Sequence, residues 1–188
     1  MKEQPKTAES KPTNMKKEIL EWIKILVTAA AIALFLNTCI IANSDVPSES
    51  MENTIMTGDR IMGSRLTYRL GGEPERGDVV IFYHKTEPGK DRTRLVKRIV
   101  GLPGETVDIR DNQVYIDQSE TPLEEPYLPE AMISEDCHFE VPEGCYLMLG
   151  DNRNHSRDAR GWSDPYVPRK DVLAKVMFRY FPGIGKIE

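Results

Sequence analysis

The stretch GDVVIFYHKTEPGKDRTRLVKRIVGLPGE, residues 77–105, contains the clearest evidence for the fold. Two pieces rich in apolar and β-branched residues, Asp78–Tyr83 and Arg94–Val100, lie on either side of the sequence EPGKD. Such residues favour strands, whereas a Pro-Gly pair favours a turn. The stretch therefore predicts two short β-strands.

Similar pieces recur along the chain and are separated by turn signals. They are Thr106–Ile109, Gln113–Ile116, Cys137–Val141, Cys145–Leu149 and Val172–Phe181. Residues 107–117 (VDIRDNQVYID) alternate in polarity around an Asp-Asn turn, as a β-hairpin does. Residues 117–136 contain three prolines and predict an extended surface excursion. We expect a mainly β, antiparallel domain over residues 43–188, without a long amphipathic helix.

The N-terminal part of the chain has a different composition. Residues 1–18 are polar and mixed in charge, which predicts a short disordered tail. Ile25 to Ala42 then run for eighteen residues without a charge, enough for a helix of about 27 Å, close to the hydrocarbon thickness of a bilayer. We expect a retained transmembrane anchor over residues 19–42. The alternatives are a soluble core helix and a cleavable signal peptide with its cleavage site at ANS, residues 42–44.

Basic residues are distributed unequally around this apolar run. Lys11, Lys16, Lys17 and Lys24 flank its start, while the first basic residue beyond its end is Arg60. The positive-inside rule therefore predicts a single-pass protein of the cell membrane, with residues 1–18 in the cytoplasm and the catalytic or binding domain outside.

Composition limits the classes of function. The 188 residues carry a net charge of −5, and the pI is near 5.4. This acidic balance argues against a nucleic-acid binder, which usually presents a basic face. The three histidines and three cysteines do not fall at metal-ligand spacing, so we expect no metal and no cofactor.

Lys97 is the first candidate for chemistry. In RLVKRIV, Leu95, Lys97 and Ile99 share one face of the predicted strand. Burial disfavours an ammonium, and the neighbours Arg94 and Arg98 would disfavour it further, so the pKa of Lys97 would fall from about 10.4 towards neutrality. A neutral lysine can accept a proton. The alternative is an edge lysine whose ammonium reaches water.

Two polar stretches supply further candidates. In SDVPSESMENTI, residues 44–55, Ser50 would be a nucleophile, with the Ser48 hydroxyl and the backbone N–H of Ser50 directed at an oxyanion; the alternative is a turn with exposed serines. GDNRNHSRDARGW, residues 150–162, is more polar than a turn requires, and His155 with Asp158 would complete a Ser-His-Asp triad.

With these stretches in order, the chain resembles the bacterial type I signal peptidase (leader peptidase) family, in its short form with one N-terminal anchor. Four blocks match in order and spacing: VPSESMENTI (46–55), GDRI (58–61), GDVVIF…RLVKRIVGLPGE (77–105) and GDNRNHSRDAR (150–160). The resemblance implies a serine endopeptidase with a β-rich catalytic domain and a serine–lysine dyad.

The resemblance also implies a role for each matching residue. Ser50 is the nucleophile, Lys97 is the general base and later the general acid, and Ser48 is the side-chain oxyanion donor beside the backbone N–H of Ser50. The supporting residues are Ser156, which orients the lysine, the ion pair of Asp158 and Arg160, and Met51, which follows the nucleophile. His155 falls at a position that varies in the family, so the triad is abandoned.

The implied substrates are secretory preproteins with signal peptides, cut after small residues at the −1 and −3 positions. The substrate would bind as an extended strand beside the segments that carry Ser50 and Lys97. Ser50 lies eight residues beyond Ala42, a span of at most roughly 28 Å, which holds it close to the outer membrane face. The expected partners are therefore preproteins and the lipid bilayer, with no nucleic acid and no metal.

Two positions depart from the family pattern: Glu49 stands where glycine is common, and Asn53 stands where proline is common. Two rival interpretations are a self-cleaving repressor-type Ser/Lys protease, which would need a DNA-binding head in place of the anchor, and an anchored non-catalytic β domain. An aspartyl signal peptidase is excluded because one anchor cannot supply two intramembrane aspartates.

The cysteines of the outer domain lie in CHFEVPEGCYLML, residues 137–149, which predicts a hairpin with its turn at PEG. In such a hairpin Cys137 and Cys145 lie roughly 13 Å apart, beyond the ~7 Å that a disulfide allows between Cα atoms. We expect these two cysteines not to pair.

Overall fold

The computed structural model describes residues 15–187. The chain divides into two units, Met1–Asn37 and Thr38–Glu188. The first unit contains the α-helix α1, Met15–Phe35. A π-helical stretch, Leu36–Ile40, follows it. Together they form one apolar helix of 26 residues, long and apolar enough to cross a membrane.

The helix differs in its bounds from the predicted anchor. Met15–Glu18, expected in the disordered tail, already form its first turn, because Met, Lys and Glu all favour helix. Ile41 and Ala42, expected in the anchor, pair instead with Ser64 and Gly63 as the start of a β-strand. Residues 1–14 of the predicted tail lie outside the described residues.

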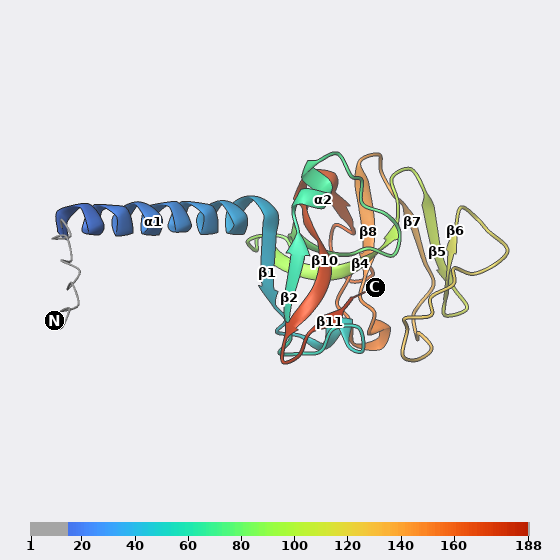
Figure 1. Cartoon of the computed structure of the whole chain (residues 1–188). Helices are drawn as coiled ribbons and strands as arrows, with labels where there is room; N and C mark the ends of the chain where they lie inside the picture. The colour runs from blue at the N-terminus through green and yellow to red at the C-terminus, as the bar shows by residue number, and fades with distance from the viewer. Residues whose placement is uncertain (1–14, 188) are drawn as a thin grey trace, which may run out of the picture. The chain divides into compact units, whose positions relative to one another are not determined.

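The second unit is a β domain in which every strand pairing is antiparallel, which confirms the predicted fold class (Figure 1). The larger sheet has the order β1-β2-β10-β3-β4-β8-β9, with β11 added to β10, and a smaller sheet has the order β6-β5-β7. The strands are β1 Ile41–Asp45, β2 Arg60–Ser64, β3 Val79–His84, β4 Thr93–Gly101, β5 Thr106–Arg110, β6 Gln113–Ile116, β7 Cys137–Glu140, β8 Cys145–Leu149, β9 Tyr166–Pro168, β10 Val172–Phe181 and β11 Gly185–Lys186.

Strand β3 is buried on both faces. Val80 and Phe82 belong to one hydrophobic cluster, whereas Val79 and Ile81 belong to another. Side chains alternate between the two faces of a strand, so β3 separates these clusters. Each fully buried side chain of this kind contributes roughly 1.5–3 kcal/mol. The central strands β3 and β4 therefore form a firm base for the polar residues that β4 carries.

All seven strands predicted from the sequence are present. Strands β3 to β8 and β10 lie within one residue of their predicted bounds. The predicted Asp-Asn turn joins β5 to β6, with Asp111 and Asn112 at φ 51° and 61°, as a type I′ turn requires. The short strands β1, β2, β9 and β11 were not predicted.

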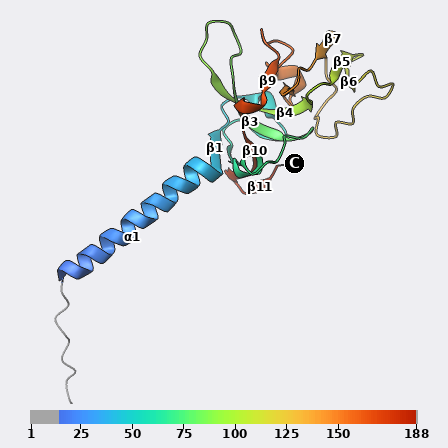
Figure 2. The ribbon, with the colours of Figure 1, turned by 90° about the horizontal axis from the view of Figure 1, so that it is seen from above.

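The predicted hairpin of residues 137–149 is wrong. Strand β7 pairs with β5 in the small sheet, while β8 pairs with β4 and β9 in the large one. The view from above shows β5, β6 and β7 grouped at one end of the domain (Figure 2). Cys137 and Cys145 are both free thiols, although not for the geometric reason given above.

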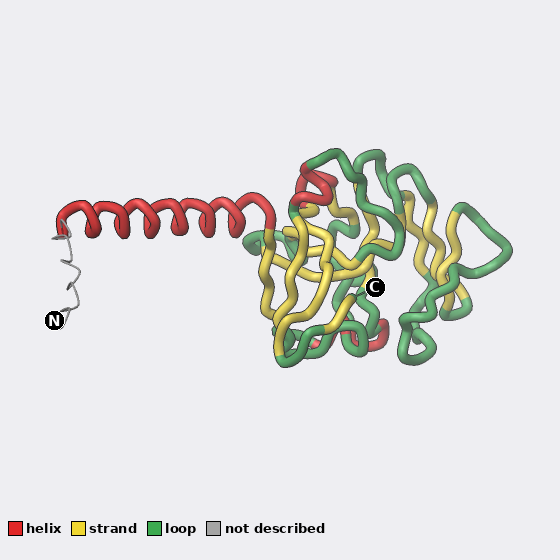
Figure 3. Tube along the Cα trace, in the orientation of Figure 1, coloured by secondary structure: helices red, strands yellow, loops and turns green. Residues whose placement is uncertain are grey.

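Few helical residues occur in the β domain (Figure 3). The helix α2, Leu66–Arg69, has four residues. The short 3₁₀ helices are Glu49–Met51, Arg153–His155 and Arg169–Asp171. Residues 117–136 contain neither helix nor strand, as expected, but they are not confined to the surface, because Met132 is buried.

Candidate active site

Ser50 lies in the 3₁₀ helix Glu49–Met51, which follows β1. Its neighbour Met51 and nearby Ile55 are buried in a hydrophobic cluster that also holds Val79 and Ile81. This packing anchors the turn to the sheet. Ser50 itself is 9 % exposed, and its hydroxyl oxygen lies 3.4 Å from that of Ser48.

Lys97 lies in the middle of β4, directly opposite Val80 of β3. It is only 3 % exposed. Burial is the main cause that lowers the pKa of Lys97 to about 8, and the positive charge of Arg160 lowers it further, against the opposing effect of Asp158 and Asp151. About a tenth of Lys97 is therefore a neutral amine at pH 7, and about half is neutral at pH 8.

The pKa of Lys97 is lowered, as the sequence predicted, but one of the causes is different. The sequence suggested that Arg94 and Arg98 would disfavour the ammonium, whereas the cation that does so is Arg160. Arg98 is the next residue along β4, so its side chain points to the opposite face of the strand. There its charge is compensated by Asp151.

Ser50 and Lys97 line the same cavity, which has a volume of about 360 Å³. One wall is formed by residues 44–51 and another by residues 93–97. Residues 93–98 of β4 pair with β3 on one side, whereas β8 joins the other side only from Arg98 onward. Within residues 15–187 no strand occupies the remaining edge of residues 93–97. The cavity thus borders an open strand edge.

The loop of residues 150–160 is attached to the turn that carries Ser50. The backbone N–H of Asn152 donates to the carbonyl oxygen of Ser50 over 3.1 Å, and its side-chain amide donates to that of Glu49 over 3.1 Å. Gly150 allows this approach, because a Cβ atom there would clash with the Ser50 carbonyl oxygen and with Ser156 Oγ. The loop and the turn are therefore in direct backbone contact.

Asp158 and Arg160 form the ion pair that the resemblance implies. Arg160 donates through Nε and Nη2 to the two carboxylate oxygens, over 2.8 and 2.9 Å. Asp158 also accepts the backbone N–H of Gly150 over 3.0 Å. Burial raises the pKa of Asp158, but the Arg160 guanidinium more than offsets this and holds it below its usual value. The carboxylate is therefore charged, and it fixes both ends of the loop.

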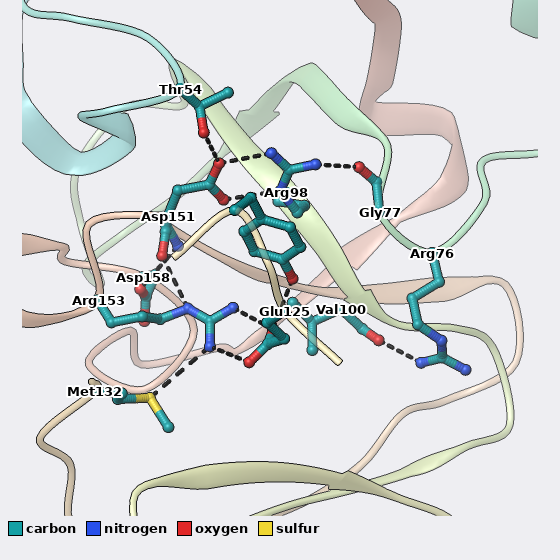
Figure 4. A network of polar contacts seen from close by, with 12 residues as sticks. Thr54, Arg76, Gly77, Arg98, Val100, Glu125, Met132, Asp151, Arg153 and Asp158 are labelled. Atoms are coloured by element: carbon teal, nitrogen blue, oxygen red, sulfur yellow. Dashed lines mark hydrogen bonds and ion pairs between the residues drawn. The ribbon is translucent and has the colours of Figure 1, made fainter. Parts of the chain in front are cut away.

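A buried charge network lies beside this loop, and sequence reasoning missed it (Figure 4). Arg98 donates to both oxygens of Asp151 over 2.9 and 2.7 Å, and the two side chains are 2 % and 0 % exposed. Arg153 is paired with Glu125 in the same way. The clue in the sequence was a charged residue inside one predicted strand, Arg98, and another just beyond the end of a second predicted strand, Asp151.

The two departures from the family pattern have simple local geometry. Glu49 begins a 3₁₀ helix, where a side chain is tolerated and glycine is not needed. Asn53 has φ 27°, a value that proline cannot adopt but that asparagine tolerates. The chain therefore turns differently here from a chain with proline at this position.

His155 lines the cavity but has no triad geometry, because Asp158 is held by Arg160 and Gly150. His84 is buried, and its Nε2 lies 2.9 Å from the carbonyl oxygen of Asp164. Across the described residues, no group of three or more His, Cys, Asp or Glu side chains is placed to hold a metal ion.

Comparisons with known proteins agree on one family. The family model described as signal peptidase, peptidase S26, matches residues 19–181. "Probable signal peptidase I-2" of Synechocystis sp. is 36% identical over 185 residues, covering 97% of this chain and 81% of that protein. Signal peptidase I of Bacillus licheniformis is 33% identical over 184 residues, covering 93% and 95%. A solved structure of a signal peptidase I from Enterococcus faecalis V583 is 33% identical, with a TM-score of 0.45 over 55% of this chain and 96% of that one.

Proposed function

Because the chain belongs to the signal peptidase family, peptidase S26, we propose that this hydrolase is a membrane-anchored serine endopeptidase that removes signal peptides from exported preproteins. A serine–lysine dyad formed by Ser50 and Lys97 carries the reaction. The observation on which the proposal depends is the buried Lys97, with its pKa lowered to about 8, in the same cavity as Ser50.

In the first half of the reaction, neutral Lys97 takes the proton of the Ser50 hydroxyl. The oxygen attacks the carbonyl carbon that precedes the scissile bond and forms a tetrahedral oxyanion. The Ser48 hydroxyl and the backbone N–H of Ser50 donate to that oxyanion. The protonated Lys97 then gives its proton to the leaving amine, which departs as the new N-terminus and leaves an ester on Ser50.

In the second half, water replaces the amine. Lys97 takes a proton from the water, the resulting hydroxide attacks the ester, and the proton returns to Ser50 as the signal peptide is released with a new carboxylate. The role assigned to Ser156 is to orient the lysine; its hydroxyl oxygen is buried beside Gly150 and has no hydrogen-bond partner among the described residues. Asp158 and Arg160 hold the loop that carries Ser156.

The open edge of residues 93–97 supports the proposed way of binding. An extended preprotein segment adds to this edge and runs beside residues 44–48 towards Ser50. The family resemblance assigns small residues to the −1 and −3 positions of that segment.

The apolar helix Met15–Ile40 supports a single membrane span. In this topology residues 1–18 lie in the cytoplasm and residues 43–188 outside, because the lysines cluster around the start of the helix and the first basic residue beyond its end is Arg60. A nucleophile attached so close to the span meets preproteins as they leave the bilayer.

The test uses the full chain in detergent or vesicles with a labelled preprotein, and the N-terminus of the product is sequenced. The wild type and Ser64→Ala, a serine outside the cavity, should release one product that starts after a small residue. Ser50→Ala should release none. If neither the wild type nor Ser50→Ala cuts the preprotein, and both bind it equally well, the result would favour the non-catalytic β domain. Cleavage of the chain itself in place of the preprotein would favour the repressor-type protease.

A further inference from the structure

The segment of residues 117–136, called the strap from here on, contacts the charge network with buried side chains. Glu125 and Tyr127 are partly buried, and Met132 is fully buried against Arg153. Nothing in the proposed reaction uses these residues. Burial of a carboxylate and a phenol has a cost in desolvation free energy. The contacts that these two side chains make must offset that cost.

The first contact joins the strap to Arg153. Glu125 accepts two hydrogen bonds from the Arg153 guanidinium, over 2.9 and 2.6 Å, and the side chains are 7 % and 1 % exposed. Tyr127 donates its hydroxyl to the same carboxylate over 2.7 Å. Burial raises the pKa of Tyr127, and the Glu125 charge raises it further, so the phenol stays protonated and remains a donor.

The second contact joins the strap to the strand that carries Lys97. The guanidinium carbon of Arg98 lies 3.9 Å from the centre of the Tyr127 ring, a distance typical of a cation–π contact. Arg98 pairs at the same time with Asp151 of the loop. Tyr127 therefore covers the guanidinium of the ion pair that ties β4 to the 150–160 loop. Figure 4 shows this ion pair between Arg98 and Asp151.

The third contact is made through Asn154. Its side-chain amide donates to Glu130 over 2.7 Å and to the carbonyl oxygen of Ala131 over 3.1 Å. Its Oδ1 accepts the backbone N–H of Ile133 over 2.8 Å. Two successive residues of the loop, Arg153 and Asn154, are thus held by the strap.

From Arg153 the contacts continue to the site. Its Nε donates to the carbonyl oxygen of Gly150 over 3.0 Å, and its own carbonyl oxygen accepts from Arg160 over 2.6 Å. Asn152, the preceding residue, holds the backbone of Ser50. A shift of Arg153 would therefore displace both the turn that carries Ser50 and the residues that support Lys97.

We propose that Glu125 and Tyr127 are positioning residues for catalysis, which hold the 150–160 loop against β4 so that Ser50, Lys97 and Ser156 keep their reacting geometry. This inference rests on the proposed peptidase function. The alternative is that the two residues contribute only to folding. Neither lines the substrate cavity, so positioning predicts an effect on kcat with KM unchanged.

Glu125→Gln and Tyr127→Leu test the inference in the full chain, with kcat and KM on one preprotein and the unfolding temperature of each variant. Both should lower kcat by about 10²-fold, the typical cost of a misplaced reacting group, with KM within a factor of two or so. Tyr127→Phe retains the ring over Arg98 and should recover most of the rate lost in Tyr127→Leu.

Two control variants separate positioning from stability. Glu124→Gln changes the exposed neighbouring carboxylate and should leave kcat unchanged. Tyr115→Leu removes a ring that lies 3.9 Å from the guanidinium of Arg110 on the small sheet; it should lower the unfolding temperature but leave kcat per folded molecule unchanged. If Tyr127→Leu does not fold, Glu125→Gln and Tyr127→Phe decide between the two roles.

A wild-type kcat in folded Glu125→Gln would overturn the inference, as would an equal loss in Tyr115→Leu and Glu125→Gln. Failure of the proposed function has a different signature, because Ser50→Ala would then cut the preprotein as well as the wild type does.

Discussion

Asn152 holds the backbone of the Ser50 turn from a position 102 residues further along the chain. Its backbone N–H donates to the carbonyl oxygen of Ser50 over 3.1 Å. Two segments that are distant in sequence thus meet through backbone atoms, which allow little adjustment. The spacing of these segments depends on the small size of the residues at the contact, above all Gly150.

Gly150→Ala should therefore abolish most of the activity. A methyl group at this position would clash with the carbonyl oxygen of Ser50 and with Ser156 Oγ. The turn or the loop must move, and a misplacement of about 1 Å can cost 10²-fold in rate. The measurement is kcat on one preprotein. Gly161→Ala is the matched control, because the nearest atom to its new Cβ would be 4.0 Å away; equal rates for both variants would refute the close approach.

Asp151→Asn should destabilise the domain strongly. Asp151 is fully buried and neutralises the buried Arg98 guanidinium, and removal of one partner from a buried ion pair typically costs about 3–5 kcal/mol. Asp45→Asn removes the exposed partner of Arg60 instead, so its effect should be small. Urea unfolding of both variants provides the comparison. An Asp151→Asn variant as stable as the Asp45→Asn variant would contradict the assignment.

The local sequence was sufficient to predict the central strands β3 and β4. Val79–Phe82 and Leu95–Val100 contain many of the residues that favour strands, and hydrophobic burial reinforces that preference. Strand β2 (RIMGS) was missed because Gly63 and Ser64 disfavour strand. It forms because it lies between β1 and β10, where a Cβ at Gly63 would be 3.0 Å from the carbonyl oxygen of Lys175. Long-range pairing of this kind leaves no local pattern.

The same reasoning applies to the site. Ser50 and Lys97 were expected from a resemblance in short blocks, and both line one cavity. The partners of the neighbouring charges could not be expected, because Arg98 and Asp151 are 53 residues apart and Glu125 and Arg153 are 28 apart. The prolines of the strap were interpreted as a sign of surface exposure, although the segment carries the acidic partner of Arg153.

The topology can be tested in intact cells. Protease added to spheroplasts should digest residues 43–188 and spare the N-terminal tail, because the lysines around the start of the apolar helix retain that end in the cytoplasm. Permeabilised cells are the control in which the tail also becomes accessible. A mature protein that begins near Ser44 would show that the helix is removed as a signal peptide.

Lys97→Arg should be nearly as inactive as Lys97→Ala, although it keeps the positive charge. Arginine stays protonated at any working pH and cannot act as a base. Loss of general base catalysis should lower kcat/KM by at least about 10²–10⁴-fold. The exposed Lys90 provides the control Lys90→Arg, which should be fully active. In the wild type, kcat/KM should rise with pH with a midpoint at about 8, where Lys97 loses its proton. Substantial activity in Lys97→Arg would make His155 the first alternative base to test.

Lys97→Met should be inactive and yet more stable than the wild type at neutral pH. The folded chain lowers the pKa of Lys97 from 10.5 to about 8, mainly by burial, so below pH 8 the buried ammonium destabilises the fold by an amount on the order of 3 kcal/mol. Between pH 8 and about 10.5 the unfolded chain binds more protons than the folded chain at this residue, so this cost falls as pH rises. Methionine has a similar length and carries no charge, so it removes the cost at every pH.

The difference in unfolding free energy between Lys97→Met and the wild type, measured by urea denaturation, should therefore be largest below pH 8 and decrease towards pH 10. A constant difference over this range, or a less stable Lys97→Met at pH 7, would show that the lysine is not strained by burial and that its amine is not maintained as a base.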